Sequence, residues 1–114
     1  MGKSETEGAR DMEKEKEIGA KMKRLSSVAN IGSLLGHPIR LLIVSLITNS
    51  GGASWTDISK ELEGVMGRLN PNTINFHLSK LVAGGIVEKR GGLFLIADGM
   101  KENGVFKAML REVK

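Results

Sequence analysis

The sequence of 114 residues contains no cysteine and no tyrosine, and it has one tryptophan and three phenylalanines. The absence of cysteine excludes disulfides, thiolate metal sites and thiol redox chemistry. No apolar run approaches the roughly 20 residues that a transmembrane helix needs. The first residues also lack the basic and then apolar pattern of a secretory leader. We therefore expect a cytoplasmic protein without a membrane partner.

Catalytic motifs are missing as well. The sequence has no glycine-rich phosphate loop, no nucleophile elbow and no His-Glu pair at metal-ligand spacing. Asp57 and Glu61 are carboxylates four residues apart, but Asp57 is expected to cap a helix, and both lie on its exposed side. The two histidines, His37 and His77, fall in different predicted helices and do not form a metal site. We expect no enzyme activity, no metal and no cofactor.

The sequence does have a modest excess of basic charge and enough apolar residues for one core. Hydrophobic residues make up 40%, and the net charge is +4. Residues 1–24 carry seven basic and six acidic groups, a net of +1, so the remaining +3 lies in residues 25–114. Such an excess fits a nucleic-acid partner, although charge alone fits any mildly basic protein equally well.

The two ends of the chain are expected to flank a central domain. Residues 1–10 are small, polar and charged, which predicts a disordered tail. Residues 11–32 and 99–114 each predict a helix with an apolar stripe. The first stripe comprises Ile18, Met22, Leu25, Val28 and Ala29, and the second comprises Phe106, Met109, Leu110 and Val113. Neither stripe has an obvious partner within the chain, so both predict a homodimer interface.

Residues 33–98 predict three helices followed by a hairpin. The first helix runs from Pro38 to about Thr48 and is apolar nearly all round. Ser54, with Asp57 three residues later, caps a short second helix. After a break at 63–70, a third helix capped by Asn72 or Thr73 runs to Ala83. Two β-rich runs then flank Gly91-Gly92, a strong hairpin signal. The expected fold is mainly α with a small two-stranded β-hairpin: a winged helix-turn-helix with flanking N- and C-terminal helices.

Two stretches carry a family resemblance. The stretch "LLGHPIRLLIVSLI" resembles the helix that opens the DNA-binding core of ArsR-type regulators. The stretch "NTINFHLSKLVAGGIVEKR" resembles their recognition helix and first wing strand. The resemblance covers 34–97 and implies a dimeric, DNA-binding transcription regulator of bacteria or archaea. Two departures stand out: the family's metal sensors use cysteine sites, which are absent here, and the 63–70 break is longer than the family's usual tight turn.

The third helix presents a polar face that can read DNA. At about 100° per residue, its core side gathers Ile74, Leu78, Leu81 and Val82, with His77 at the border. His77 is expected to hydrogen-bond a neighbouring helix, and Arg40 to pair internally.

The opposite side of the third helix carries Thr73, Asn75, Phe76, Ser79 and Lys80. Asn can form paired hydrogen bonds with adenine, Ser and Thr can bond to either base type, and Phe can contact a thymine methyl. This side of the helix therefore favours A·T-rich sequence. Phe76 has an alternative role as a core residue beneath Trp55, the break or a partner subunit.

Basic residues outside this helix complete the expected interface with double-stranded DNA. Arg68 in the break, and Lys89 and Arg90 in the wing, can each hold a phosphate. The full predicted set is Arg68, Asn72, Thr73, Asn75, Phe76, Ser79, Lys80, Lys89 and Arg90. The alternative function is a winged-helix interaction module within a larger transcription or nucleoprotein assembly. The sequence does not indicate a small-molecule effector.

Overall fold

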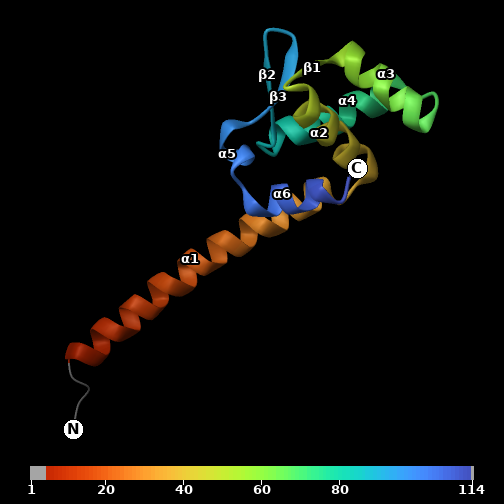
Figure 1. Ribbon diagram of the computed structural model, residues 1–114. Helices are drawn as coiled ribbons and strands as arrows, with labels where there is room; N and C mark the ends of the chain where they lie inside the picture. Colours follow the sequence, from red (N-terminus) through yellow and green to blue (C-terminus); the bar gives the residue numbers. More distant parts are fainter. Residues whose placement is uncertain (1–4, 114) are drawn as a thin grey trace.

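The computed structural model describes the backbone of residues 5–113 and the side chains of residues 13–113 (Figure 1). Six helices and three strands follow one another in these residues: α1 (Glu5–Leu35), α2 (Pro38–Ser50), β1 (Ala53–Ser54), α3 (Trp55–Met66), α4 (Pro71–Ala83), β2 (Val87–Arg90), β3 (Leu93–Ile96), α5 (Asp98–Lys101) and α6 (Gly104–Arg111). The predicted winged helix-turn-helix is confirmed, with α2, α3 and α4 as its helices and β2 and β3 as its wing.

The first helix begins earlier than its charge pattern predicted. α1 starts at Glu5 rather than at Asp11, so residues 5–10, expected as part of a disordered tail, are helical. Four of the six residues of this segment, Glu5, Glu7, Ala9 and Arg10, are good helix formers. High charge was therefore the wrong criterion for disorder here. The expected tail residues 1–4 lie outside the described part of the chain.

α2 occupies the centre of the domain, as its apolar sequence predicted. The His37 side chain caps it by accepting a hydrogen bond from the Ile39 N–H at 3.3 Å, and Pro38 fills the first turn. Ile43, Val44 and Ile47 are buried within the core. Because α2 contacts α1, α3, α4 and the sheet, it sets the position of every element around it.

The sheet has one strand more than predicted. β2 and β3 form an antiparallel hairpin in which Val87 pairs with Ile96 and Arg90 with Leu93. Gly91 and Gly92 have φ angles of 53° and 82°, the left-handed values that a tight hairpin turn requires. β1 adds to the other edge of β3, giving the order β1-β3-β2. Two residues of β1 next to a helix cap leave no alternating pattern in the sequence, so this strand was missed.

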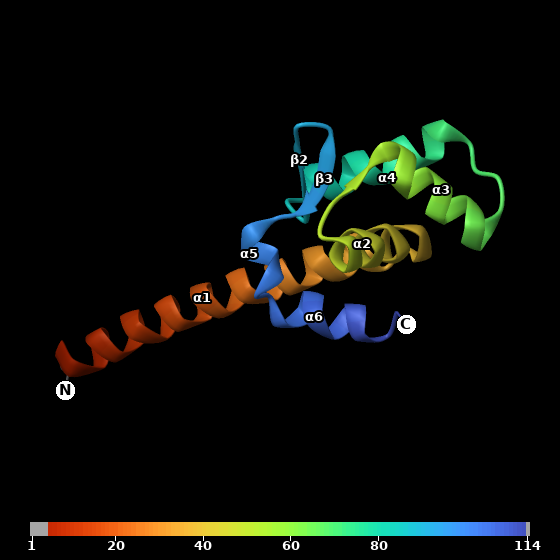
Figure 2. The same cartoon turned by 45° about the horizontal axis from the view of Figure 1, so that its top comes forward.

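The C-terminal segment is two short helices rather than the single helix expected for 99–114. The break falls at Asn103, whose side chain accepts hydrogen bonds from the N–H groups of Val105 and Phe106 and so caps α6. α6 folds back beside α1 (Figure 2). Phe106 is buried in the core of its own chain, so its predicted place in a dimer interface is wrong. Met109 and Leu110 are half-buried against the same core.

The N-terminal part of α1 projects away from the domain (Figures 1 and 2), and the molecule measures 73 × 26 × 24 Å. Ile31 and Leu35, at its C-terminal end, lie in the core. The apolar side chains before them are exposed: Ile18 by 62%, Met22 by 57%, Leu25 by 51% and Val28 by 44%. Among the described residues, no single helix has the length and hydropathy of a membrane span, although residues 13–35 and 38–50 reach these limits together as a pair bent by 98°.

Candidate nucleic-acid interface

The helix pair α3–α4 forms the base of the candidate interface. Ser54 and Asp57 make the predicted reciprocal capping box at the start of α3. α3 continues past Gly64 to Met66 and ends at Gly67, whose φ of 80° is left-handed. α4 begins at Pro71 and is capped by the Asn70 side chain, not by Asn72 or Thr73 as predicted. The connection therefore spans only residues 67–70 and is shorter than the sequence suggested.

The buried side of α4 fixes which side faces outward. Ile74, Leu78 and Leu81 are buried as predicted, but Val82 is exposed. His77 takes the remaining core position and is only 5% exposed. His77 and Val82 border the apolar face of α4 on opposite sides. The helix is rotated so that its His77 side, and not its Val82 side, is buried. A hydrogen-bond partner for His77 is available there on α2.

Arg40 of α2 provides that partner and joins three helices. Its Nε–H donates to His77 Nδ1 at 3.1 Å, and its Nη1 donates to the backbone oxygen of Leu34 at 3.3 Å. The ring of His37 lies 4.4 Å from that of His77, centroid to centroid. Burial, and then the charges of His37 and Arg40, lower the pKa of His77. A neutral His77 therefore holds α4 against α2 and the end of α1.

The outward side of α4 carries the predicted reading residues. Asn72, Asn75, Ser79 and Lys80 are exposed, and Thr73 is half-buried. Phe76 is 53% exposed, so it is not a core residue of its own chain beneath Trp55 or the break. Its ring contacts the edge of His77, and Lys80 Nζ lies 5.5 Å from the ring centroid. The face is a polar strip with one aromatic and one cation at its middle.

Trp55 adds a contact that the sequence did not reveal. Its Nε1–H donates to Asn75 Oδ1 at 2.7 Å. The indole nitrogen can only donate, so this bond fixes which end of the Asn75 amide is oxygen. The amide nitrogen and the second lone pair of Oδ1 stay available, and these are the groups that pair with adenine. The sequence indicated Trp55 only as a possible cover for Phe76 and did not predict this hydrogen bond.

The two basic wing residues lie on opposite faces of the hairpin, because side chains alternate along a strand. Lys89 borders a groove of about 580 Å³ between α4 and the wing, together with Asn75 and Ser79. Its Nζ is 5.5 Å from the centroid of the Phe94 ring. Arg90 lies on the other face and pairs with Glu88 at 2.7 Å. The structure therefore joins Lys89 to the α4 face and separates Arg90 from it, contrary to its predicted place in the interface.

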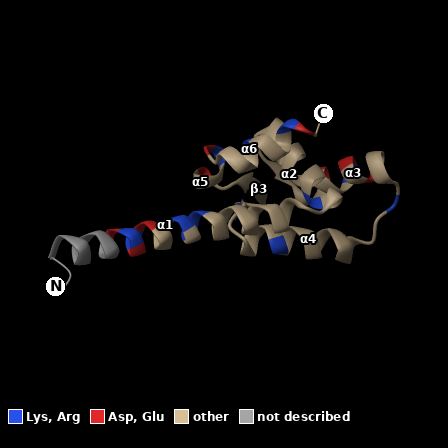
Figure 3. Ribbon diagram, turned by 90° about the horizontal axis from the view of Figure 1, so that it is seen from below, with Lys and Arg blue, Asp and Glu red and all other residues tan. Residues whose placement is uncertain are grey.

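The charge distribution agrees with an interface that includes α4 and Lys89 but not Arg90. α4 contains one basic residue, Lys80, and no acidic residue. Arg68 is exposed in the connection that leads into α4. Charges of both signs alternate along the projecting part of α1, whereas α4 is largely uncharged (Figure 3). No group of three or more His, Cys, Asp or Glu side chains able to hold a metal occurs among the described residues.

Comparison with known families agrees with this architecture. Residues 35–90 match the model of a helix-turn-helix domain family. The matched segment runs from the end of α1 to the end of β2 and so contains the whole helix pair. The observed fold is a winged helix-turn-helix, and the family match supports the helix-turn-helix DNA-binding class. The match does not single out the ArsR type. No protein of curated function matches the sequence.

Proposed function

We propose that the protein is a transcription regulator that binds double-stranded DNA sequence-specifically, with α4 in the major groove. The observation that carries this proposal is the exposed polar strip of α4, in which Trp55 orients the Asn75 amide. A side-chain amide held in one orientation is prepared for paired hydrogen bonds to adenine. Ordering it before binding also lowers the entropy lost on complex formation.

Each exposed residue has a role that its chemistry allows. Asn75 reads adenine and Phe76 contacts the methyl group of a neighbouring thymine. Asn72, Thr73 and Ser79 bond to base edges or backbone. Phosphate contacts come from the cations on this face of the molecule: Arg68, Lys80 and Lys89.

We propose further that the regulator is a homodimer joined through α1. At about 100° per residue, Ile18, Met22 and Leu25 fall within one narrow sector of the helix. This sector lies roughly a third of a turn away from Ile31 and Leu35, which face the core of the same chain. The stripe is therefore a separate seam, and its three- and four-residue spacing suits packing against a second α1. Occupancy of DNA near a promoter would then block or assist polymerase.

A second candidate function is an interaction module within a larger nucleoprotein assembly. It is favoured by one observation, the exposure of Phe76 in the middle of the α4 face. An exposed aromatic is also a common anchor in protein interfaces. In that case a partner protein, rather than DNA, would cover α4.

A gel-shift experiment separates the two functions. Random and A·T-rich duplexes are compared at two salt concentrations, with wild type, Asn75→Ala and the control Asn49→Ala, an exposed Asn of α2 away from α4. We expect Asn75→Ala to lose about 1–3 kcal/mol on the preferred duplex and much less on random DNA, because base contacts carry discrimination. Equal binding of all three proteins to both duplexes would favour the interaction module.

A further inference from the structure

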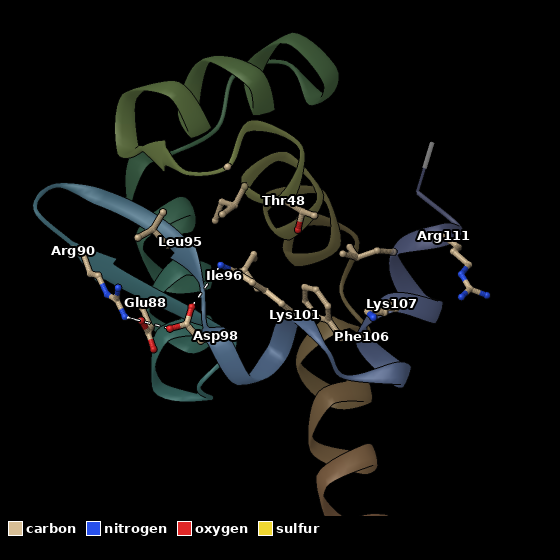
Figure 4. Close-up of a pocket in the computed structure, with 13 residues that line it drawn as sticks. Thr48, Glu88, Arg90, Leu95, Ile96, Asp98, Lys101, Phe106, Lys107 and Arg111 are labelled. Carbon is tan, nitrogen blue, oxygen red and sulfur yellow. Dashed lines mark hydrogen bonds and ion pairs between the residues drawn. The ribbon is translucent and has the colours of Figure 1, made fainter.

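A pocket of about 540 Å³ lies on the face of the hairpin that is turned away from α4 (Figure 4). It is bounded by the end of α2, by the wing, and by the C-terminal segment from α5 to α6. Its volume falls within the roughly 300–1,000 Å³ typical of small-molecule sites. None of its lining residues belongs to the α4 reading face, so the DNA interface does not account for it.

The floor of this pocket is apolar. It is formed by side chains from three different parts of the fold: Ile47, Leu95, Ile96, Phe106 and Leu110. Ile47, Ile96 and Phe106 belong to the buried core, and their outer edges form the bottom of the pocket. An occupant would thus exchange water for contact with aliphatic and aromatic surface, which favours a ligand with an apolar body.

The rim is charged, and its two ends differ. At the wing end, Arg90 pairs with Glu88 at 2.7 Å and with Asp98 at 3.9 Å. Lys101 also approaches Asp98, at 3.5 Å. The carboxylates at this end are therefore already matched by cations.

The α6 end carries positive charge that is only partly matched by the acidic groups of residues 13–113. Arg111 makes no ion pair with any of the residues 13–113. Within the same residues, the one pair of Lys107 is with Glu102 at 3.3 Å, and Glu102 is not a lining residue. Exposed pairs of this kind contribute about 0–1 kcal/mol, so a ligand anion can replace Glu102 at little cost. Figure 4 shows Lys107 and Arg111 together on α6, across the apolar floor from Glu88 and Asp98.

We propose that this pocket binds a small amphipathic organic anion. Its apolar body lies along Ile96 and Phe106, and its carboxylate bonds to Lys107 and Arg111. A guanidinium can bind a carboxylate through two parallel hydrogen bonds, and a lysine adds a point charge. A neutral apolar molecule would gain nothing from the charges of Lys107 and Arg111, and a highly polar anion would leave the apolar floor in contact with water. The site stands independently of the proposed DNA binding.

The test uses octanoate as the probe and octanol as its uncharged match. Titration calorimetry and thermal unfolding are performed on the full chain, without DNA. We expect one octanoate per chain, bound about tenfold more tightly than octanol, and a rise in Tm because the ligand binds only the folded state. Octylamine, with the opposite charge, is expected to bind less tightly than octanol.

Variants locate the site. Lys107→Ala and Arg111→Ala should each weaken octanoate binding severalfold and leave octanol binding unchanged. Lys60→Ala removes an exposed cation of α3, outside this pocket, and should change neither. The proposal is overturned if octanoate binds no more tightly than octanol, if several molecules bind per chain, or if the two α6 variants bind octanoate as the wild type does.

Discussion

Asn75 and Trp55 show that the chemistry of the α4 face depends on contacts between helices. The bond from the indole N–H to Asn75 Oδ1 joins residues twenty positions apart in the sequence. Helical periodicity placed Asn75 on the outward side of α4 correctly, because that argument is local. It could not find the tryptophan that orients the amide, because the pairing depends on the angle between α3 and α4.

Phe76 provides a prediction at this scale. Because its ring is about half exposed, Phe76→Ala should change the free energy of unfolding by no more than about 0.5 kcal/mol. If the ring contacts a thymine methyl, preference at one base pair should be lost, as measured by selection of DNA from a random pool. A loss of several kcal/mol in urea unfolding would instead mean that the ring is packed in the core.

His77 predicts a pH dependence of stability. Its folded pKa is lowered below the ordinary value of 6.5, so the unfolded chain binds the proton more tightly. Stability is therefore complete above about pH 6.5 and falls as the pH drops from there toward the folded pKa. For one proton, the slope is at most about 1.4 kcal/mol per pH unit.

The measurement is urea unfolding between pH 5 and 8. His77→Gln keeps an acceptor for Arg40 and does not titrate, so part of the slope below pH 6.5 should disappear in this variant. An unchanged slope would assign the pH dependence to other groups.

Among the elements, those with strong end signals were predicted most accurately. Pro38 and the Ser54 capping box located α2 and α3, and Gly91-Gly92 located the wing. Two of the misses have one cause, which is that an asparagine side chain caps a helix where the sequence pattern did not indicate a cap. Asn103 divides the C-terminal segment and Asn70 moves the start of α4 to Pro71. An Asn can lie within a helix or cap one, and only the surrounding structure decides which.

The contact between α4 and α1 can be tested with two glycines. Gly84 has right-handed φ, but an added Cβ would overlap Leu34 Cδ1 and lie 3.2 Å from the Lys80 carbonyl oxygen. Gly84→Ala should therefore destabilise the fold by about 1 kcal/mol through overpacking. Gly64, inside α3, has open space around it, so Gly64→Ala should stabilise by about 0.5–1 kcal/mol. Urea unfolding of both variants measures this difference, and the same sign for both would contradict it.

At the scale of the whole molecule, the chain has two unlike parts: a packed domain and a projecting helix. The sequence predicted that two terminal helices flank the central domain. In the structure, α1 projects from the domain over most of its length, but Ile31 and Leu35 at its C-terminal end lie in the core. The structure also differs for α6, whose Phe106 completes the core of its own chain. Periodicity alone shows that a helix has an apolar side, but it cannot show whether the same chain or another covers that side.

The proposed dimer gives the prediction at this scale. Leu25→Glu places a charge in the exposed stripe of α1 and should convert a dimer to a monomer in sedimentation. Ser27→Glu adds the same charge on the opposite side of the helix and should leave the dimer intact. Because Leu25 does not pack in the core, the variant should keep its helical circular dichroism. A wild-type monomer at micromolar concentration would rule out the α1 seam.

The order β1-β3-β2 leaves β2 at an edge of the sheet, with backbone groups that have no neighbouring strand. Such an edge can recruit an extended segment of another protein and so begin aggregation. Glu88, Lys89 and Arg90 fill most of this short strand, and charged side chains at an edge oppose that pairing. The same three residues therefore contribute to keeping the protein dispersed in a crowded cell, whether or not DNA is bound.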